Sequence, residues 1–454
     1  MDTIAALATP EGIGSIAVIR ISGSEALDIA SKVFTPIDSR KSLAEAKGYT
    51  ALFGHFIEEN KVRDEVVALV FRAPLSYTGE DVVELSCHGG SGVCNMLLHE
   101  LYAHGAVAAE RGEFTKRAFL NSRISLTQAE AVMDMINASS TRAINAAAAA
   151  MQGNLYAQIQ TVQQALIVQA GHIAAYTDYP EEGVEELQLD DLSEQLCVQI
   201  DVLQRLCADY GKSAVIKNGV KAAIVGSPNV GKSTLLNLLS GFDRAIVTSQ
   251  AGTTRDVVEQ EINIAGIRLI LADTAGLRDT DNIIETEGIR RSYDVLQKAE
   301  MVIAVFDSGE AITEKDMELA KLCQNKNSIA VINKQELERV FDASVIEPFF
   351  GEIVYITAKD NKSIGIIEKA IEKVLNLCDS DMTNARLASE RQYTAAQKAL
   401  LALQDANIAV QSGITLDAVG VCIDDALAAL YSLTGESASE DIINEVFSKF
   451  CVGK

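Results

Sequence analysis

The feature that most constrains the fold is Gly226-Ser-Pro-Asn-Val-Gly231-Lys232-Ser233, which matches the phosphate-binding pattern G-x-x-x-x-G-K-[ST]. The apolar run VKAAIVG before it predicts a buried strand, and STLLNLLS after it predicts a helix. Backbone N–H groups of such a loop point at phosphates, and the helix N-terminus adds a favourable dipole. The motif therefore predicts a nucleotide site in which Lys232 contacts the β- and γ-phosphates and the Ser233 hydroxyl binds Mg²⁺.

Further short motifs follow in the order typical of GTPases. Asp273-Thr-Ala-Gly closes the strand-like run IRLILAD, and its carboxylate would hold the metal through water. Thr253 or Thr254 in AGTTRD can supply a second hydroxyl to Mg²⁺, and we assign Thr254 to the metal. Asn333-Lys-Gln-Glu336 stands where guanine-specific proteins place N-K-x-D. Thr357-Ala-Lys can contact the base edge through backbone N–H groups.

These motifs together predict a site for GTP and Mg²⁺. The residues assigned to GTP are Asn229, Val230, Gly231, Lys232, Ser233, Thr234, Thr248, Ser249, Gln250, Ala251, Gly252, Thr253, Thr254, Asp273, Thr274, Ala275, Gly276, Asn333, Lys334, Glu336, Thr357, Ala358 and Lys359.

Two positions depart from the ordinary small GTPase. Leu277 follows the DTAG motif where Ras-like proteins carry a water-orienting glutamine, so either hydrolysis is slow or another residue orients the water. Glu336 replaces the usual aspartate and sets the carboxylate one methylene further out. We expect guanine preference to be retained with altered affinity.

Four segments differ in texture along the chain. Residues 1–118 mix β-like runs with glycine-rich turns and predict an α+β module, whereas residues 119–215 and 379–454 have helical periodicity. Residues 216–378 alternate strands and helices and predict an α/β domain with a mostly parallel sheet. The predicted architecture is a multidomain chain in which an α/β domain is inserted into a helical domain that is split in the sequence.

The net charge of −24 argues against a general nucleic-acid coat or docking on anionic membranes. The two helical segments carry −8 and −6 of this charge. The N-terminus does not resemble a signal peptide, and the chain has no apolar run long enough for a bilayer. Eight scattered cysteines without a CxxC pair suggest reduced thiols, so we expect a cytoplasmic protein.

The motifs GSPNVGKST, GTTRD and DTAGLRDTDNIIETEGI, together with the terminal Phe-Cys-Val-Gly-Lys, resemble the MnmE (TrmE) family of bacterial tRNA-modification GTPases over the whole chain. The resemblance implies an N-terminal folate-binding-like domain at 1–118, a helical domain in two parts at 119–215 and 379–454, and an inserted Ras-like G domain at 216–378.

The resemblance also implies K⁺-dependent GTP hydrolysis. Asn229 matches the K⁺-ligating position of the family, and Thr248, Gln250 and Thr253 match the loop that folds over the ion. A cation beside the β/γ bridge would offset charge that develops in the transition state. Glu285 matches the catalytic glutamate, although by itself it would be an ordinary exposed carboxylate. Taken alone, Asn229 is also consistent with a simple turn residue.

A folate site and a functional cysteine follow from the same resemblance. Arg20, Glu84, Arg123 and Lys454 match positions that line a 5-formyl-tetrahydrofolate pocket, and Arg123 stands where a lysine is expected. Without the resemblance, Arg20 and Arg123 would be assigned to surface salt bridges. Cys451 stands fourth from the end, but the residues after it do not fit a prenylation box. The family instead makes it a functional residue near the one-carbon donor.

The predicted function is a homodimeric GTPase that acts with the flavoprotein MnmG to form an aminomethyl-type (carboxymethylaminomethyl) group on the wobble uridine of certain tRNAs. Because the helical segments are acidic, we expect the partner to supply most tRNA contacts. The alternatives are a ribosome-assembly or other regulatory GTPase switch, which usually carries a basic RNA-binding module, and a self-assembling structural GTPase.

Overall fold

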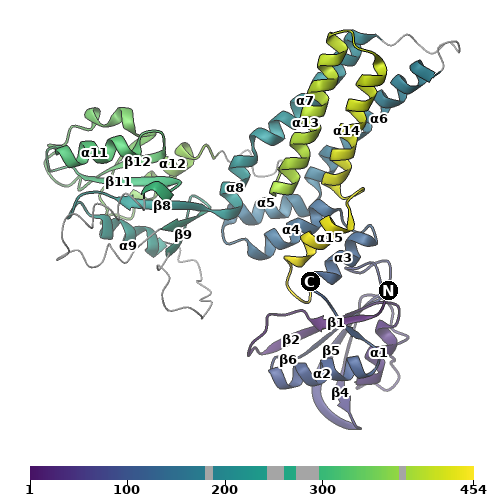
Figure 1. The fold of residues 1–454 in the computed structure, drawn as a ribbon. Coiled ribbons are helices and arrows are strands. Elements are labelled where there is room, and N and C mark those ends of the chain that lie inside the picture. Colours follow the sequence, from purple (N-terminus) through teal and green to yellow (C-terminus); the bar gives the residue numbers. More distant parts are fainter. Residues whose placement is uncertain (179–187, 243–259, 272–295, 378–384) are drawn as a thin grey trace. The chain divides into compact units, whose positions relative to one another are not determined.

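The computed structural model describes residues 1–178, 188–242, 260–271, 296–377 and 385–454. These residues form two compact units, and each unit is described by itself (Figure 1). The first unit comprises residues 1–133, 159–172 and 420–454, and the second comprises residues 134–158 and 173–419. Within the described ranges, no helix is both long enough and apolar enough to cross a membrane.

A seven-stranded sheet forms the centre of the first unit, in the order β3-β4-β5-β6-β2-β1-β7. Its strands are β1 (Ile4–Leu7), β2 (Ile16–Ser22), β3 (Phe34–Pro36), β4 (Thr50–Glu58), β5 (Lys61–Phe71), β6 (Val82–His88) and β7 (Val107–Ala108). Side chains alternate between the two faces of such strands. Ile19 and Ile21 of β2 therefore join one apolar core with α1 (Ala26–Val33) and α2 (Ser91–Ala103).

Near β1, the opposite face of this sheet packs on helix α3 (Glu113–Leu120). Ile4 and Ala6 of β1 form a small apolar cluster with Phe114 of α3. The C-terminal helix α15 (Glu440–Ser448) contacts α3, and Arg111 forms a short antiparallel bridge with Val452. The end of the chain thereby lies beside α3.

The second unit is built on a six-stranded sheet in the order β13-β12-β11-β8-β10-β9. Its strands are β8 (Val220–Val225), β9 (Gln260–Ile264), β10 (Ile267–Leu271), β11 (Met301–Asp307), β12 (Asn327–Asn333) and β13 (Glu352–Tyr355). All neighbouring pairs are parallel except β9 with β10, so the predicted mostly parallel sheet is confirmed.

Helices cover both faces of this sheet (Figure 1). Helices α9 (Lys232–Phe242) and α12 (Ser363–Val374) pack on one face, and α11 (Glu314–Cys323) packs on the other. Every residue of β11 is buried, as expected for a parallel strand with both faces covered. Two short 3₁₀ turns, Ala343–Val345 and Glu347–Phe349, precede β13.

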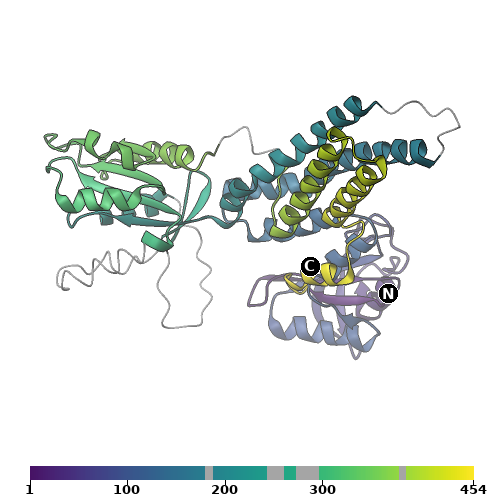
Figure 2. The same ribbon diagram turned by 45° about the horizontal axis from the view of Figure 1, so that its top comes forward.

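The remaining helices are α4 (Leu126–Asn137), α5 (Thr141–Met151), α6 (Asn154–Asp178), α7 (Leu189–Ala208), α8 (Tyr210–Asn218), α13 (Glu390–Gln411) and α14 (Leu416–Thr434). Helices α7 and α13 lie side by side, although the six-stranded sheet separates them in sequence (Figure 2). Ser193 donates to Asn407 at 2.7 Å, and the rings of Tyr210 and Tyr393 stack 4.5 Å apart. Helical segments from both sides of the α/β region thus pack on each other.

Candidate nucleotide and folate sites

The loop after β8 has the backbone conformation that a phosphate-binding loop requires. Gly226 and Gly231 have φ values of 148° and 102°, and Asn229 has a left-handed φ of 65°. A Cβ atom at Gly226 would collide with the carbonyl oxygen of Val305, and one at Gly231 would collide with the side-chain amide of Asn333. The glycines therefore provide both the φ angles and the space for close packing.

Lys232 begins helix α9 and turns its ammonium group back over the loop. Its Nζ donates to the carbonyl oxygens of Gly226 at 2.9 Å and Ser227 at 2.8 Å. Burial lowers the pKa of this lysine, as expected where a positive charge leaves water. The hydroxyl of Ser227 donates to Asp316 at 3.0 Å, which joins the loop to α11.

Asn333, at the end of β12, connects the phosphate loop with the segment after β13. Its Nδ2 donates to the Val230 carbonyl at 2.9 Å, and its Oδ1 accepts from the Ala358 N–H at 2.9 Å. The side chain is buried, with 3% exposed. The backbone N–H of Ala358, which is predicted to contact the guanine base, therefore donates to Asn333 in this structure. The Ser363 hydroxyl donates to the Thr357 carbonyl at 2.8 Å and holds the same segment.

Lys334 and Glu336 differ in their surroundings. Lys334 has a φ of 62°, and its Nζ pairs with the buried carboxylate of Asp307 at 2.5 Å. The Oδ1 atom of Asp307 accepts from the Gly309 N–H at 3.0 Å. Glu336 is exposed. Asp307, which ends β11, was not assigned from the sequence; its position at the carboxyl end of a strand is the only local signal for it.

Other predicted nucleotide residues take the following positions. Ser233 is exposed in the first turn of α9, Thr234 is half-buried there, and Lys359 is exposed. Several residues lie outside the described ranges: Thr248, Ser249, Gln250, Ala251, Gly252, Thr253, Thr254, Asp273, Thr274, Ala275, Gly276 and Glu285.

Arg20 and Glu84, two of the predicted folate residues, form an ion pair on the sheet of the first unit. They face each other across β2 and β6, and both the Nε and the Nη2 of Arg20 lie 2.8 Å from Glu84 Oε1. The guanidinium carbon lies 5.2 Å and 5.6 Å from the ring centres of Tyr77 and Phe114. These two rings carried no periodic signal in the sequence and were missed.

The other two predicted folate residues lie around the same elements. The N–H of Phe114 donates to the Lys454 carbonyl at 3.2 Å, so the C-terminal residue lies beside the ring that Arg20 contacts. Arg123 packs against Gly79, where an added Cβ would meet Arg123 Cγ at 3.2 Å. Both Gly79 and Tyr77 belong to the segment before β6.

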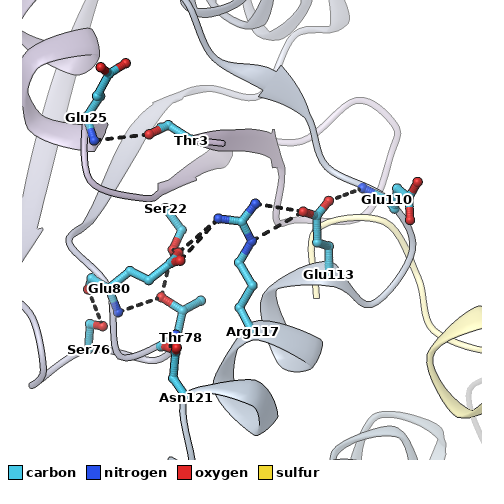
Figure 3. A network of polar contacts seen from close by, with 10 residues as sticks. All are labelled: Thr3, Ser22, Glu25, Ser76, Thr78, Glu80, Glu110, Glu113, Arg117 and Asn121. Carbon is cyan, nitrogen blue, oxygen red and sulfur yellow. Dashed lines mark hydrogen bonds and ion pairs between the residues drawn. The ribbon is translucent and has the colours of Figure 1, made fainter. Parts of the chain in front are cut away.

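A neighbouring arginine on α3 belongs to a different network (Figure 3). Arg117 is 4% exposed and pairs with Glu80 at 3.1 Å and Glu113 at 2.8 Å. Glu80 also accepts from the Ser22 hydroxyl at 2.8 Å. Arg117 therefore links α3 to the segment before β6 as a buried, doubly paired cation.

The cysteines differ sharply in exposure. Cys87 is buried and the adjacent His88 is exposed, because successive residues of strand β6 point to opposite faces of the sheet. Burial and the nearby Cys94 thiol raise the pKa of Cys87 to about 12. Cys451 is exposed, and its carbonyl accepts from the Gly112 N–H at 3.2 Å.

Two hollows are present in the described residues. One, of about 390 Å³, is bounded by α5, α8 and β10 and is lined by alanines together with Lys217 and Arg268. The other lies on α3 and α15 beside Met1 and Arg117. Neither is lined by a residue assigned to GTP or folate.

Comparisons with known proteins support the resemblance expected from the motifs. A family model of the MnmE helical domain matches residues 126–451, and one of the GTP-binding protein TrmE N-terminus matches residues 3–123. Among solved structures, the G domain of the T. maritima FeoB iron transporter is similar to part of the chain, at 25% identity. The match covers 34% of this chain and 98% of that chain, with a TM-score of 0.26.

Two relatives that match over nearly their full length are both named tRNA modification GTPase MnmE. The chain is 39% identical to the tRNA modification GTPase MnmE of Lactococcus lactis subsp. lactis over 455 residues, which cover 100% of this chain and 98% of that protein. It is 39% identical to the protein of that name from Streptococcus thermophilus, with coverage of 100% and 98%. Because both the family models and the full-length relatives match, the chain belongs to the MnmE family of tRNA modification GTPases.

Proposed function

We propose that the GTP hydrolysis carried out by this tRNA modification GTPase depends on K⁺, and that the protein acts with the flavoprotein MnmG on the wobble uridine of certain tRNAs. The observation that carries the proposal is the bridge made by Asn333 between the phosphate loop and the segment after β13. It joins loops that would hold the two ends of a guanine nucleotide, in a chain whose full-length relatives are named tRNA modification GTPases.

The phosphate end of the site suits Mg²⁺. Ser233 is an exposed residue in the first turn of α9, and we assign its hydroxyl to the metal together with that of Thr254, which lies outside the described residues. Mg²⁺ prefers oxygen ligands and would neutralise charge on the β- and γ-phosphates. The half-buried Lys232 holds its ammonium group over the same loop and adds a second positive charge.

For K⁺ we propose Asn229 as the ligand from the phosphate loop. Its left-handed backbone and exposed side chain suit a carboxamide that faces an ion at the β/γ bridge. Thr248, Gln250 and Thr253 would complete the ligands, and Glu285 would orient water in place of the glutamine that Leu277 replaces. The ion would supply the positive charge that an arginine finger supplies in other GTPases.

GTP turnover is expected to be several-fold faster in KCl than in NaCl at equal ionic strength. Asn229→Gly is the sharpest variant, because glycine keeps the positive φ and removes only the carboxamide. We expect it to bind GDP as the wild type does and to lose most of the K⁺ stimulation. Equal wild-type rates in the two salts would refute the assignment of K⁺.

For the first unit we propose a folate-binding role in which Arg20 and Glu84 recognise 5-formyl-tetrahydrofolate. The carboxylate of Glu84 can accept from the N–H groups of a pterin, and Tyr77 and Phe114 provide aromatic surface beside it. Arg123 and Lys454 would neutralise the carboxylates of the glutamate tail. Cys451 is exposed near the same C-terminal segment and would act close to the one-carbon unit.

We propose segments 1–118, 119–215, 216–378 and 379–454 as the domains of this protein, with the G domain inserted into the helical one. We also propose a homodimer in which the G domains meet, acting in the cytoplasm. The helical segments are strongly acidic, so MnmG would supply most of the phosphate contacts to tRNA.

Analysis of wobble uridines in tRNA from a deletion strain tests the biological role. We expect the carboxymethylaminomethyl-type modification to be absent and to return when the wild-type chain is expressed. A strain with normal wobble uridines and defective ribosomal subunits would instead support the alternative of a ribosome-assembly switch.

A further inference from the structure

The turn between β9 and β10 forms hydrogen bonds with helix α5, which precedes the whole α/β region in sequence. Strand β9 pairs with β10 through Ile264 and Ile267, which leaves Ala265 and Gly266 as a two-residue turn. Their φ values are 53° and 70°, the sign pattern of a type I′ hairpin turn. Ala265 is 8% exposed, so this hairpin end is buried against its neighbours.

Arg142, near the start of α5, makes the contacts that hold this turn. Its Nε donates to the Ala265 carbonyl at 2.8 Å, and its backbone N–H donates to the Gly266 carbonyl at 3.1 Å. Its Nη2 pairs with Glu372 of α12 at 2.6 Å. The arginine is therefore bonded at once to both turn residues and to a helix on the sheet.

The fit at this contact is close. The Arg142 side chain is 5% exposed, and a Cβ at Gly266 would lie 3.0 Å from its Cγ. Ser140 caps α5 by accepting from the Ala143 N–H at 3.3 Å, so the first turn of the helix is well ordered. Asn263 of β9 adds a second link, because its Nδ2 donates to the Ser139 carbonyl at 2.8 Å. The positive end of the α5 dipole also faces the Gly266 carbonyl.

The hairpin lies in sequence between the AGTTRD and DTAG motifs, both of which are assigned to GTP and Mg²⁺. In sequence, β9 begins shortly after Thr254, and β10 ends two residues before Asp273. Strand β10 is also paired with β8, the strand that leads into the phosphate loop. A displacement of the turn along the strand direction would thus shift β8, which leads into the phosphate loop, together with β10, which leads towards Asp273, since paired strands move together.

We propose that Arg142 is a positioning residue for GTP hydrolysis, which couples the contact between α5 and the β9–β10 turn to the nucleotide site. The guanidinium fork suits this role, because it bonds the turn carbonyl and the Glu372 carboxylate in one rigid plane. The proposal goes beyond the assignments of K⁺ and folate and rests only on the proposed GTP hydrolysis.

The first test compares turnover in three full-length variants at a temperature where all are folded. Arg142→Gln is expected to lower kcat for GTP about fivefold with KM nearly unchanged, which corresponds to about 1 kcal/mol of activation free energy. Arg142→Lys keeps the charge but not the fork and should fall equally. Arg117→Gln is the matched control, because Arg117 is as buried and is paired with two carboxylates in the first unit. Its kcat should not change.

The second test does not require turnover. Hydrogen exchange of the Arg142 amide is compared with GDP and with a non-hydrolysable GTP analogue bound to the wild-type chain. We expect its protection to differ between the two nucleotides. Identical exchange, or a kcat for Arg142→Gln no lower than that for Arg117→Gln, would overturn the coupling. A wild type without turnover would refute the proposed GTPase function, and exchange would still decide the coupling.

Discussion

Replacing Gly231 with alanine is expected to weaken GDP and GTP binding at least a hundredfold, about 2.7 kcal/mol. The φ of 102° at this position is one that side-chain-bearing residues rarely adopt, and the new Cβ would collide with the Asn333 amide. If Asn333 moves away, the Val230 carbonyl and the Ala358 N–H lose their partner. An unpaired buried polar group costs about 1–3 kcal/mol, so the loop is destabilised whether Asn333 stays in place or moves away.

Titration with a fluorescent guanine nucleotide measures this effect, and Gly365→Ala is its control. Gly365 lies in α12 with no atom close to its Cβ position. There, alanine should stabilise the helix by about 0.5–1 kcal/mol and leave nucleotide affinity unchanged. If Gly231→Ala bound GDP like the wild type, the collision and the role of the Asn333 bridge would both be contradicted.

Arg20→Gln is expected to raise the dissociation constant for 5-formyl-tetrahydrofolate about tenfold or more, in line with the loss of one charge-assisted hydrogen bond. The substitution removes the cation beside Tyr77 and Phe114 and leaves Glu84 without its ion pair. Glu84 would then no longer be held in a fixed orientation for the pterin. Isothermal titration of the full-length chain with this folate measures the change.

The control for this titration is Arg63→Gln, which breaks an ion pair with Glu58 on the same sheet. It should bind the folate as the wild type does, since neither residue contacts the rings beside Arg20 in the described contacts. Equal binding by Arg20→Gln and wild type would exclude Arg20 from the site. A wild type that binds no folate would refute the folate proposal as a whole.

Local sequence patterns predicted the second unit well. The apolar run before Gly226 forms β8 and the residues from Lys232 form α9, as predicted, and the motif that begins at Asn333 lies at the end of β12. For the long helical stretch after residue 119, the sequence predicted helical periodicity but not where each helix begins and ends. It breaks into α4, α5 and α6, because Ser140 caps a new helix and Gly153 adopts a φ of 84°.

The sequence by itself determined which motifs this protein carries, their order and the family to which it belongs. Each of these depends on residues that are close along the chain, where spacing and periodicity encode local geometry. Tertiary structure alone decided which distant residues meet. Arg142 bonds Ala265 across 123 positions and Glu372 across 230. No local pattern encodes such pairs, because they arise only when packed helices and sheets bring separate segments together.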